Sequence, residues 1–97
     1  MNDKKGFATN CIHAGEIVDQ FGAPHTPIYD TTTFSFSSTA DMLSVIEGRK
    51  QGYLYTRYGS NPSIMSVEAK LARLENAEGA LAFASGMAAI SATLFAH

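Results

Sequence analysis

The sequence predicts an α/β fold, and three stretches carry that prediction. Residues 80–84 are an unbroken apolar run followed by Ser85 and Gly86, which is typical of a short buried strand and a turn. Residues 86–96 are almost wholly apolar, with only Ser91 and Thr93 as exceptions, and are rich in alanine, the best helix former. Residues 62–76 repeat apolar side chains every three or four positions, as an amphipathic helix does. We therefore expect a helix, then a strand, a tight turn and a second helix.

The length and composition allow one small domain and exclude several classes of partner. The chain has 97 residues, a formal net charge of −2 and 45% hydrophobic residues, so its core is modest. This charge gives no electrostatic footprint for nucleic acid or a membrane surface. No apolar run reaches the roughly 18 residues of a membrane span, and residues 1–6 show no signal peptide. The single cysteine, Cys11, excludes an internal disulfide, so we expect a reducing, cytoplasmic setting.

Residues 1–36 show no helical periodicity, and we expect them to form an arm that lies on another surface. Residues 27–34 can form a short extended segment, but no turn pairs it into a hairpin. A disordered tail is the alternative. Against it stand many apolar side chains that can anchor an arm. These are Phe7, Ile12, Ile17, Val18, Phe21, Ile28, Tyr29, Phe34 and Phe36.

A short helix is expected to follow the arm. Ser38 or Thr39 would cap it, Asp41 would lie in its first turn, where the helix dipole favours an acid, and Gly48 would end it. Its apolar face would consist of Met42, Leu43, Val45 and Ile46.

The longer helix is expected to begin at Asn61 and Pro62, with asparagine as the cap and proline at the first helical position, and to end near Asn76. One face is apolar and is expected to pack inward: Ile64, Val67, Leu71 and Leu74. Polar side chains are expected on the other faces: Ser66, Glu68, Lys70, Arg73 and Glu75.

The turn at Ser85 and Gly86 is the first candidate site. The Ser85 hydroxyl can cap the following helix, and Gly86 removes a Cβ where the backbone approaches another group. The first N–H groups of a helix have no partner within it and lie at the positive end of its dipole. The turn therefore suits an anion such as a phosphate. The alternative is a plain strand–turn–helix with water at these N–H groups.

Arg57 is the second candidate. Its forked donors match a phosphate, and Tyr55 would point the same way if the segment were extended. The alternative is a surface arginine with its stem over aromatic rings. Cys11 and His13 stand two residues apart, but no second pair at zinc spacing exists, so no metal site is expected.

Four segments occur in an order and at spacings that resemble one enzyme family: Asn10–Gly15, Pro27–Phe34, Tyr55–Ser63 and Ala84–Ala89. They are similar to the trans-sulfuration, or Cys/Met metabolism, group of pyridoxal-phosphate enzymes. This group includes cystathionine synthases and lyases, methionine γ-lyase and O-acetylhomoserine sulfhydrylase. The resemblance spans almost the whole chain. One departure is Ser63, where the family often has threonine.

The resemblance implies the N-terminal part of a fold-type-I, aspartate-aminotransferase-like enzyme. Residues 1–61 would be an arm that contacts the neighbouring subunit, and residues 62–97 would begin the large cofactor-binding domain. Such enzymes are usually homotetramers built as a dimer of dimers. The chain would then be a fragment of a longer protein, an expectation that its strongly apolar last helix also favours.

The resemblance also implies which residues bind the cofactor, pyridoxal 5′-phosphate. Tyr55 and Arg57 would bind the phosphate in the neighbouring subunit's site. The backbone N–H groups of Gly86 and Met87 would bind the phosphate in the chain's own site, with Ser85 in the same turn.

The implied activity is γ-replacement, γ-elimination or β-elimination on cystathionine, methionine or an O-acylhomoserine, and family membership favours γ-chemistry. The Schiff-base lysine, the aspartate at the pyridine nitrogen and the tyrosine stacked on the ring would lie beyond His97. Neither Lys50 nor Lys70 stands in a matching motif, so no catalytic residue is assigned and the chain alone is expected to be inactive. The alternative is a non-catalytic oligomerisation or interaction module whose Ser–Gly turn binds no cofactor.

Overall fold

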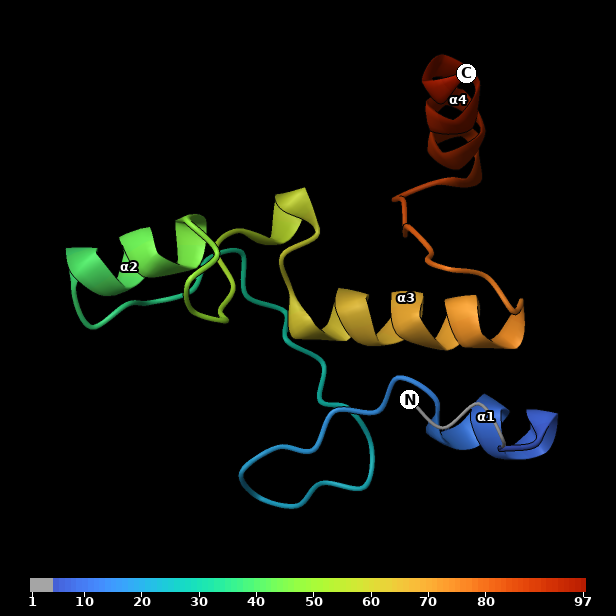
Figure 1. Cartoon of the computed structure of the whole chain (residues 1–97), viewed down its shortest axis with the longest axis horizontal. Helices are drawn as coiled ribbons and strands as arrows, with labels where there is room; N and C mark the ends of the chain where they lie inside the picture. Colours follow the sequence, from blue (N-terminus) through green and yellow to red (C-terminus); the bar gives the residue numbers. More distant parts are fainter. Residues whose placement is uncertain (1–4) are drawn as a thin grey trace.

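The computed structural model describes residues 5–97, so residues 1–4 of the expected arm lie outside the described part. In that part the regular elements are helical, apart from one isolated β-bridge (Figure 1). In chain order they are α1 (Phe7–His13), α2 (Thr39–Ile46), the 3₁₀ turn η1 (Thr56–Tyr58), α3 (Pro62–Leu74) and α4 (Gly86–Ala96). None of the described helices has the length and apolar character needed to cross a membrane.

These elements are spread out rather than closed around a core. The radius of gyration is 15.4 Å, whereas about 12–13 Å is expected for a compact domain of this length. The accessible surface is 7687 Å², against about 5400 Å² for a globular protein of this mass. Among the described elements only α1 and α3 pack directly, and no hydrophobic side chain in the described part is fully buried.

A chain without a core should not unfold cooperatively. We expect residues 1–97 alone to show a broad, low-amplitude thermal transition by circular dichroism and to associate as the concentration rises. A sharp melt of a soluble monomer, with equal midpoints from far-ultraviolet circular dichroism and tyrosine fluorescence, would contradict this expectation.

Helix α1 is not predicted by the sequence, and the expectation of an arm without a helix is wrong at Phe7–His13. The helix is short, and its N-cap residue, a glycine, makes no side-chain cap bond. Contacts with α3 stabilise it instead. The Lys70 ammonium donates to the carbonyl oxygens of Cys11 and Ile12, each at 3.1 Å, so it satisfies acceptors that the end of a helix leaves open.

Helix α3 meets the arm with polar side chains. The Ser63 hydroxyl accepts from the Tyr29 N–H and donates to the Pro27 carbonyl, each at 2.8 Å. The Ser66 hydroxyl donates to the Gly15 carbonyl at 2.6 Å. With Lys70, these serines stand three and four residues apart on one face of the helix. We call Ser63, Ser66 and Lys70 the polar seam.

The seam corrects the predicted orientation of α3. Ser66 is buried, at 9% exposure, whereas Val67 and Leu71 of the expected inward stripe are about half exposed, at 51% and 47%. The reason is that an irregular arm presents unpaired carbonyl and N–H groups, which need hydrogen-bond partners when they are covered. Short hydroxyl side chains supply these partners, and an apolar stripe cannot.

The arm comes very close to α3 at Gly15. This residue has a φ of +76°, and a Cβ placed there would clash with the backbone carbonyl oxygen of Ser66 and lie 2.9 Å from the backbone nitrogen of Lys70. Both the backbone conformation and the space therefore require glycine. Gly15, Pro27 and Tyr29 thus lie against α3 of the same chain. Most of the loop between Gly15 and Pro27 lies away from α3, and α2 also extends away from it (Figure 1).

Helix α2 confirms its prediction. The Ser38 hydroxyl accepts from the Asp41 N–H at 3.1 Å, and Gly48, with a φ of +75°, lies just beyond the end of the helix. The Ser37 hydroxyl and then the Lys50 ammonium lower the pKa of the Asp41 carboxyl, because both stabilise its charged form.

The predicted strand at residues 80–84 does not form. The segment is irregular, with Leu81 78% exposed and Phe83 43% exposed. A strand requires a neighbouring strand, and the described part of the chain offers only the bridge between Thr33 and Tyr55. The segment is held by the Glu68 carboxylate, which accepts from the Ala82 N–H at 2.8 Å.

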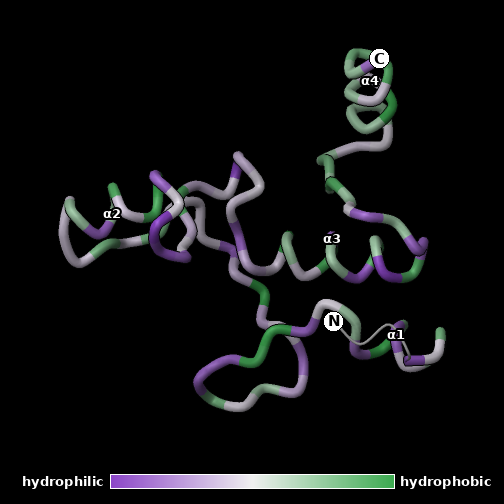
Figure 2. Tube along the Cα trace, in the orientation of Figure 1, coloured by the Kyte–Doolittle hydropathy of each residue, from purple (hydrophilic) through white to green (hydrophobic). Residues whose placement is uncertain are grey.

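The predicted turn and last helix are confirmed. Helix α4 begins at Gly86, with Ser85 as its cap. No hydrophilic stripe runs along it (Figure 2), and Met87, Leu94 and Phe95 are 68%, 72% and 91% exposed.

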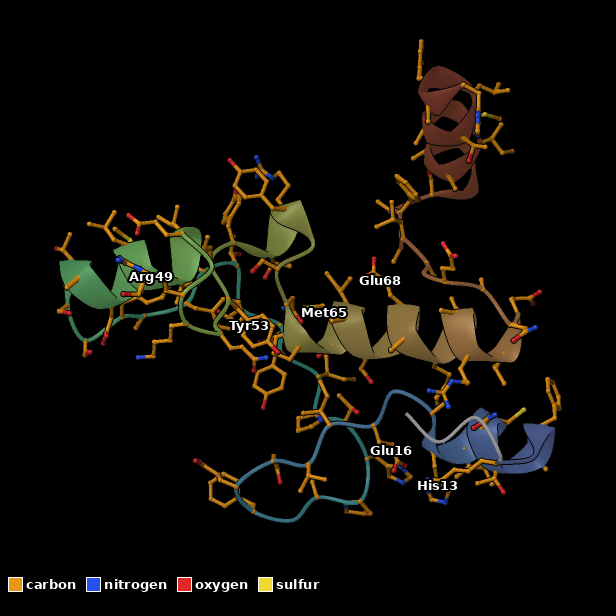
Figure 3. All side chains as sticks on the ribbon, viewed as in Figure 1. His13, Glu16, Arg49, Tyr53, Met65 and Glu68 are labelled. Atoms are coloured by element: carbon orange, nitrogen blue, oxygen red, sulfur yellow. The ribbon has the colours of Figure 1, made fainter. Side chains whose placement is uncertain are left out.

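Met65 and Glu68 lie on the face of α3 that turns away from the arm (Figure 3). Helix α3 is confirmed from Pro62 and ends at Leu74, two residues earlier than expected.

Candidate functional site

The first group of candidate residues gathers at η1. Tyr55 is extended and precedes the turn, which Gly59 closes by donating its N–H to the Thr56 carbonyl at 2.9 Å. The guanidinium carbon of Arg57 lies 5.2 Å from the centre of the Tyr55 ring, a cation–π distance. The Tyr58 ring meets the Tyr55 ring edge-on, with centroids 5.2 Å apart.

This geometry settles how Tyr55 and Arg57 come together. The segment is not extended at Arg57, because residues 56–58 form a 3₁₀ turn. The two side chains nevertheless converge, with Arg57 over the ring as in the alternative arrangement. Arg57 is exposed, and no carboxylate in the described part of the chain forms an ion pair with it. Its donors can therefore bind an external anion.

The second group lies at the start of α4. The Ser85 hydroxyl accepts from the Ala88 N–H at 3.1 Å, and the Ser85 carbonyl accepts from the Ala89 N–H at 3.2 Å. The N–H groups of Gly86 and Met87 make no hydrogen bond within residues 5–97. These two donors and the positive end of the helix dipole face solvent at one place.

Gly86 leaves room at this place. Its φ is not in the positive range, and a Cβ built there would meet nothing within 4 Å. The chain itself therefore does not require glycine at this position. A group that approaches the N–H donors closely would require it.

The structure does not bring the two groups together. η1 lies near the N-terminal end of α3, whereas α4 stands apart from η1, above the C-terminal half of α3 in the view of Figure 1. Within residues 5–97 no hydrogen bond or ring contact joins Tyr55 or Arg57 to residues 85–87. One copy of this chain therefore presents two separate half-sites, each made of hydrogen-bond donors.

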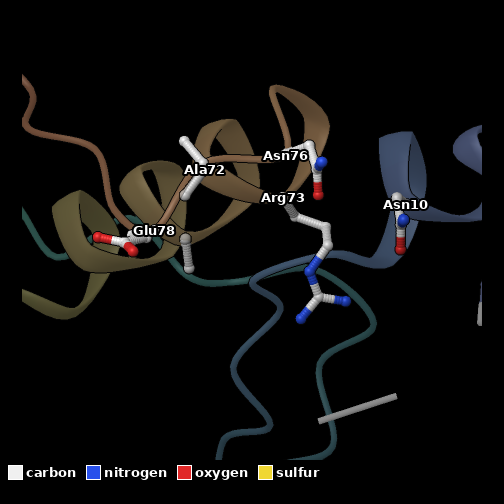
Figure 4. Close-up of a pocket in the computed structure, with 7 residues that line it drawn as sticks. Asn10, Ala72, Arg73, Asn76 and Glu78 are labelled. Atoms are coloured by element: carbon white, nitrogen blue, oxygen red, sulfur yellow. The ribbon is translucent and has the colours of Figure 1, made fainter. Parts of the chain in front are cut away.

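A cavity of about 570 Å³ lies elsewhere, between α1 and the end of α3 (Figure 4). Asn10, Arg73, Asn76 and Glu78 line it, and it includes none of the candidate residues. Within the described residues no cluster of three or more histidine, cysteine or acidic side chains could hold a metal ion.

Asn61 is a residue whose role the sequence shows only in part. Its Oδ1 accepts from the Ser63 N–H at 2.8 Å, which confirms the predicted cap. Its amide nitrogen also donates to the Tyr29 carbonyl and to the Thr56 hydroxyl, and the residue is only 1% exposed. The sequence pattern that identifies Asn61 as a helix cap does not indicate which groups its amide nitrogen contacts.

The comparisons with known proteins agree on one group of enzymes. A family model described as Cys/Met metabolism PLP-dependent enzyme matches residues 8–97. An L-methionine gamma-lyase of Porphyromonas gingivalis is 45% identical over 92 residues, which cover 95% of this chain and 23% of that protein. An O-acetyl-L-homoserine sulfhydrylase of Corynebacterium glutamicum is 40% identical over 88 residues, covering 90% of this chain and 20% of that protein.

Solved structures give the same picture. The crystal structure of metB from Corynebacterium glutamicum matches 94% of this chain and 22% of that chain, with a TM-score of 0.76 and 39% identity. Cystathionine gamma-lyase from yeast matches 93% of this chain and 21% of that chain, with a TM-score of 0.76 and 40% identity. The chain thus spans about a quarter of the length of the curated relatives it matches.

Proposed function

The chain belongs to the Cys/Met metabolism family of pyridoxal-phosphate-dependent enzymes, and we propose that it forms the N-terminal part of a longer enzyme of sulfur amino acid metabolism. The predicted fold class is confirmed, since the matched structures are fold-type-I enzymes and the chain corresponds to their N-terminal part.

The proposal rests on one observation: both half-sites consist of groups that can donate hydrogen bonds. Tyr55 and Arg57 supply a phenol and a guanidinium, and residues 85–87 supply a hydroxyl and two open N–H groups. All of these groups can donate hydrogen bonds. They fit the phosphate of pyridoxal 5′-phosphate, which is anionic and accepts hydrogen bonds only.

The cofactor, when bound, supplies an electron sink for carbanions at the substrate. The role of this chain is to hold the phosphate and so fix the orientation of the ring. A guanidinium stacked on a phenol loses less freedom on binding than an arginine that moves freely, which favours a firm hold. The two N–H groups of α4 are fixed by the helix and need no rearrangement.

We further propose that each complete site combines two chains. Tyr55 and Arg57 of one chain would serve the phosphate held by residues 85–87 of the neighbouring chain, in a homo-oligomer built as a dimer of dimers. The separation of the half-sites supports this arrangement. So does an accessible surface of 7687 Å², which exceeds that of a globular protein of this mass by about 2300 Å². Residues 1–61 would form the arm, and residues 62–97 would begin the large domain.

The proposed substrates are sulfur amino acids or O-acylhomoserines. Relatives named as methionine gamma-lyases and a cystathionine gamma-lyase favour γ-elimination, and the sulfhydrylase keeps γ-replacement open. Catalysis would depend on residues outside this chain, so residues 1–97 alone would be inactive. The single thiol, Cys11, which is free and exposed, suits a cytoplasmic setting.

The test is a cofactor titration of the full-length enzyme, followed by a substrate comparison. We expect one pyridoxal 5′-phosphate per chain, with a visible absorption band. We also expect release of thiol, ammonia and a keto acid from L-methionine, or consumption of sulfide with O-acetylhomoserine. A stable oligomer that binds no cofactor would overturn the proposal and favour an interaction module.

A further inference from the structure

Asn61 is the most deeply buried side chain of the described residues, although it is polar. It is 1% exposed in a structure whose described part buries no hydrophobic side chain completely. Its amide makes three hydrogen bonds: Oδ1 accepts from the Ser63 N–H at 2.8 Å, and the NH₂ group donates to the Tyr29 carbonyl at 2.9 Å and to the Thr56 hydroxyl at 3.1 Å. A buried amide satisfied on both sides fixes its neighbours strongly, because any movement leaves a polar group without a partner.

The bond to Thr56 has a defined direction. The Thr56 hydroxyl donates its own hydrogen to the Thr31 carbonyl at 2.6 Å, so its oxygen is free to accept from Asn61. The Thr56 N–H also donates to the Thr32 carbonyl at 2.9 Å. Asn61 therefore joins the first residue of η1 to the arm and to the start of α3.

Thr56 lies between the two residues of the first half-site. Within residues 5–97 the Arg57 side chain makes no hydrogen bond, and its guanidinium lies over the Tyr55 ring. The direction in which Arg57 projects is therefore set by the backbone of η1. The Asn61–Thr56 bond holds that backbone.

We propose that Asn61 is a positioning residue for the cofactor phosphate: it holds Thr56 and thereby presents Tyr55 and Arg57 as a preorganised pair. This inference rests on the proposed function, because it assigns the pair to the phosphate. Preorganisation raises affinity by removing the cost of ordering the side chains on binding.

The chain offers variants that separate positioning from capping. Asn61→Asp keeps an oxygen that can accept from the Ser63 N–H at the start of α3, where a negative charge is favoured. It removes both N–H donors and so breaks the bonds to Tyr29 and Thr56. Thr56→Val removes the hydroxyl with little change of shape, and Thr56→Ser restores a hydroxyl. Ser38→Ala is the stability control, because it removes the cap of α2, away from η1.

The measurement compares pyridoxal 5′-phosphate with pyridoxal, which lacks the phosphate, in titrations of the full-length apo-enzyme. Loss of a charge-assisted phosphate contact corresponds to about tenfold to a hundredfold in affinity. We expect Asn61→Asp to weaken binding of pyridoxal 5′-phosphate within this range and to leave pyridoxal binding unchanged. Thr56→Val should have the same effect as Asn61→Asp, and Thr56→Ser should bind pyridoxal 5′-phosphate almost as tightly as the parent enzyme. Ser38→Ala should alter the dissociation constant of neither compound.

The outcomes separate this inference from the proposed function. If Arg57→Ala does not alter the preference for pyridoxal 5′-phosphate over pyridoxal, the assignment of Arg57 to the phosphate fails, and this inference fails with it. If Arg57→Ala reduces the preference but Asn61→Asp and Thr56→Val do not, Asn61 is only a cap. The double variant Asn61→Asp with Arg57→Ala should weaken binding by less than the two single variants added together, because both changes act on the same pair, Tyr55 and Arg57. If Asn61→Asp does not fold, the two Thr56 variants still decide the question.

Discussion

Mixing two inactive variants of the full-length enzyme should restore activity to roughly a quarter of the parental level. One variant carries Arg57→Ala, and the other lacks the lysine that links the cofactor in this family. Each homodimer should be nearly inactive, because loss of a bidentate contact to phosphate costs on the order of 2–3 kcal/mol. If Arg57 serves the neighbour's site, a hybrid dimer has one site with both defects and one with neither. Random pairing makes half of the dimers hybrid.

A matched mixture controls for simple stabilisation by mixing. Arg57→Ala and Tyr55→Phe both alter the half-site at η1, so every site of their hybrid contains one defect and no intact site arises. This mixture should stay at the activity of its components. If mass spectrometry shows that subunits exchange and the first mixture still gains no activity, Arg57 acts in its own chain or does not bind the phosphate.

Gly86→Val should weaken binding of pyridoxal 5′-phosphate by roughly a hundredfold or more, because its side chain would displace the phosphate from two N–H donors. The stability of the apo-enzyme should change little. The chain leaves open space around this Cβ, and the φ of Gly86 is not positive. The measurements are a cofactor titration and the midpoint of thermal unfolding of the apo-enzyme.

Gly79→Val is the control for this variant. Gly79 also has open space around its Cβ and no positive φ, but it lies outside the turn before α4. Gly79→Val should change neither the affinity for the cofactor nor the midpoint of thermal unfolding of the apo-enzyme. Equal cofactor affinity in Gly86→Val and the parent enzyme would show that the start of α4 does not bind the phosphate.

The sequence predicts the parts of this structure that depend on local chemistry. Three helix starts are identified by a residue whose side chain caps its own helix: Ser38, Asn61 and Ser85. In each case the donor is a backbone N–H two or three residues along the chain, so the signal is contained in a few positions. The same few positions at Ser85 and Gly86 are enough to predict a helix start with open N–H donors, which is what an anion requires.

The parts that could not be predicted depend on contacts between distant residues. α1 has no cap bond of its own and is held by Lys70, more than fifty residues along the chain. The apolar run at residues 80–84 predicts a strand, but a strand needs a partner that the described residues do not supply. The second role of Asn61 depends on Tyr29 and Thr56, whose positions the local sequence does not specify.

The polar seam on α3 has a consequence for how this chain can diverge. Ser63, Ser66 and Lys70 bind carbonyl and N–H groups of the arm that belong to the backbone rather than to particular side chains. Two arm residues are exceptions: Gly15, where only glycine fits, and Thr26, whose hydroxyl is hydrogen-bonded to the Ser66 hydroxyl at 3.0 Å. Elsewhere, attachment at these points does not depend on which side chains the arm bears. Exposed arm residues such as Val18, Phe21 and Ile28 are therefore free to vary with whatever surface the arm meets, while the arm stays attached to α3.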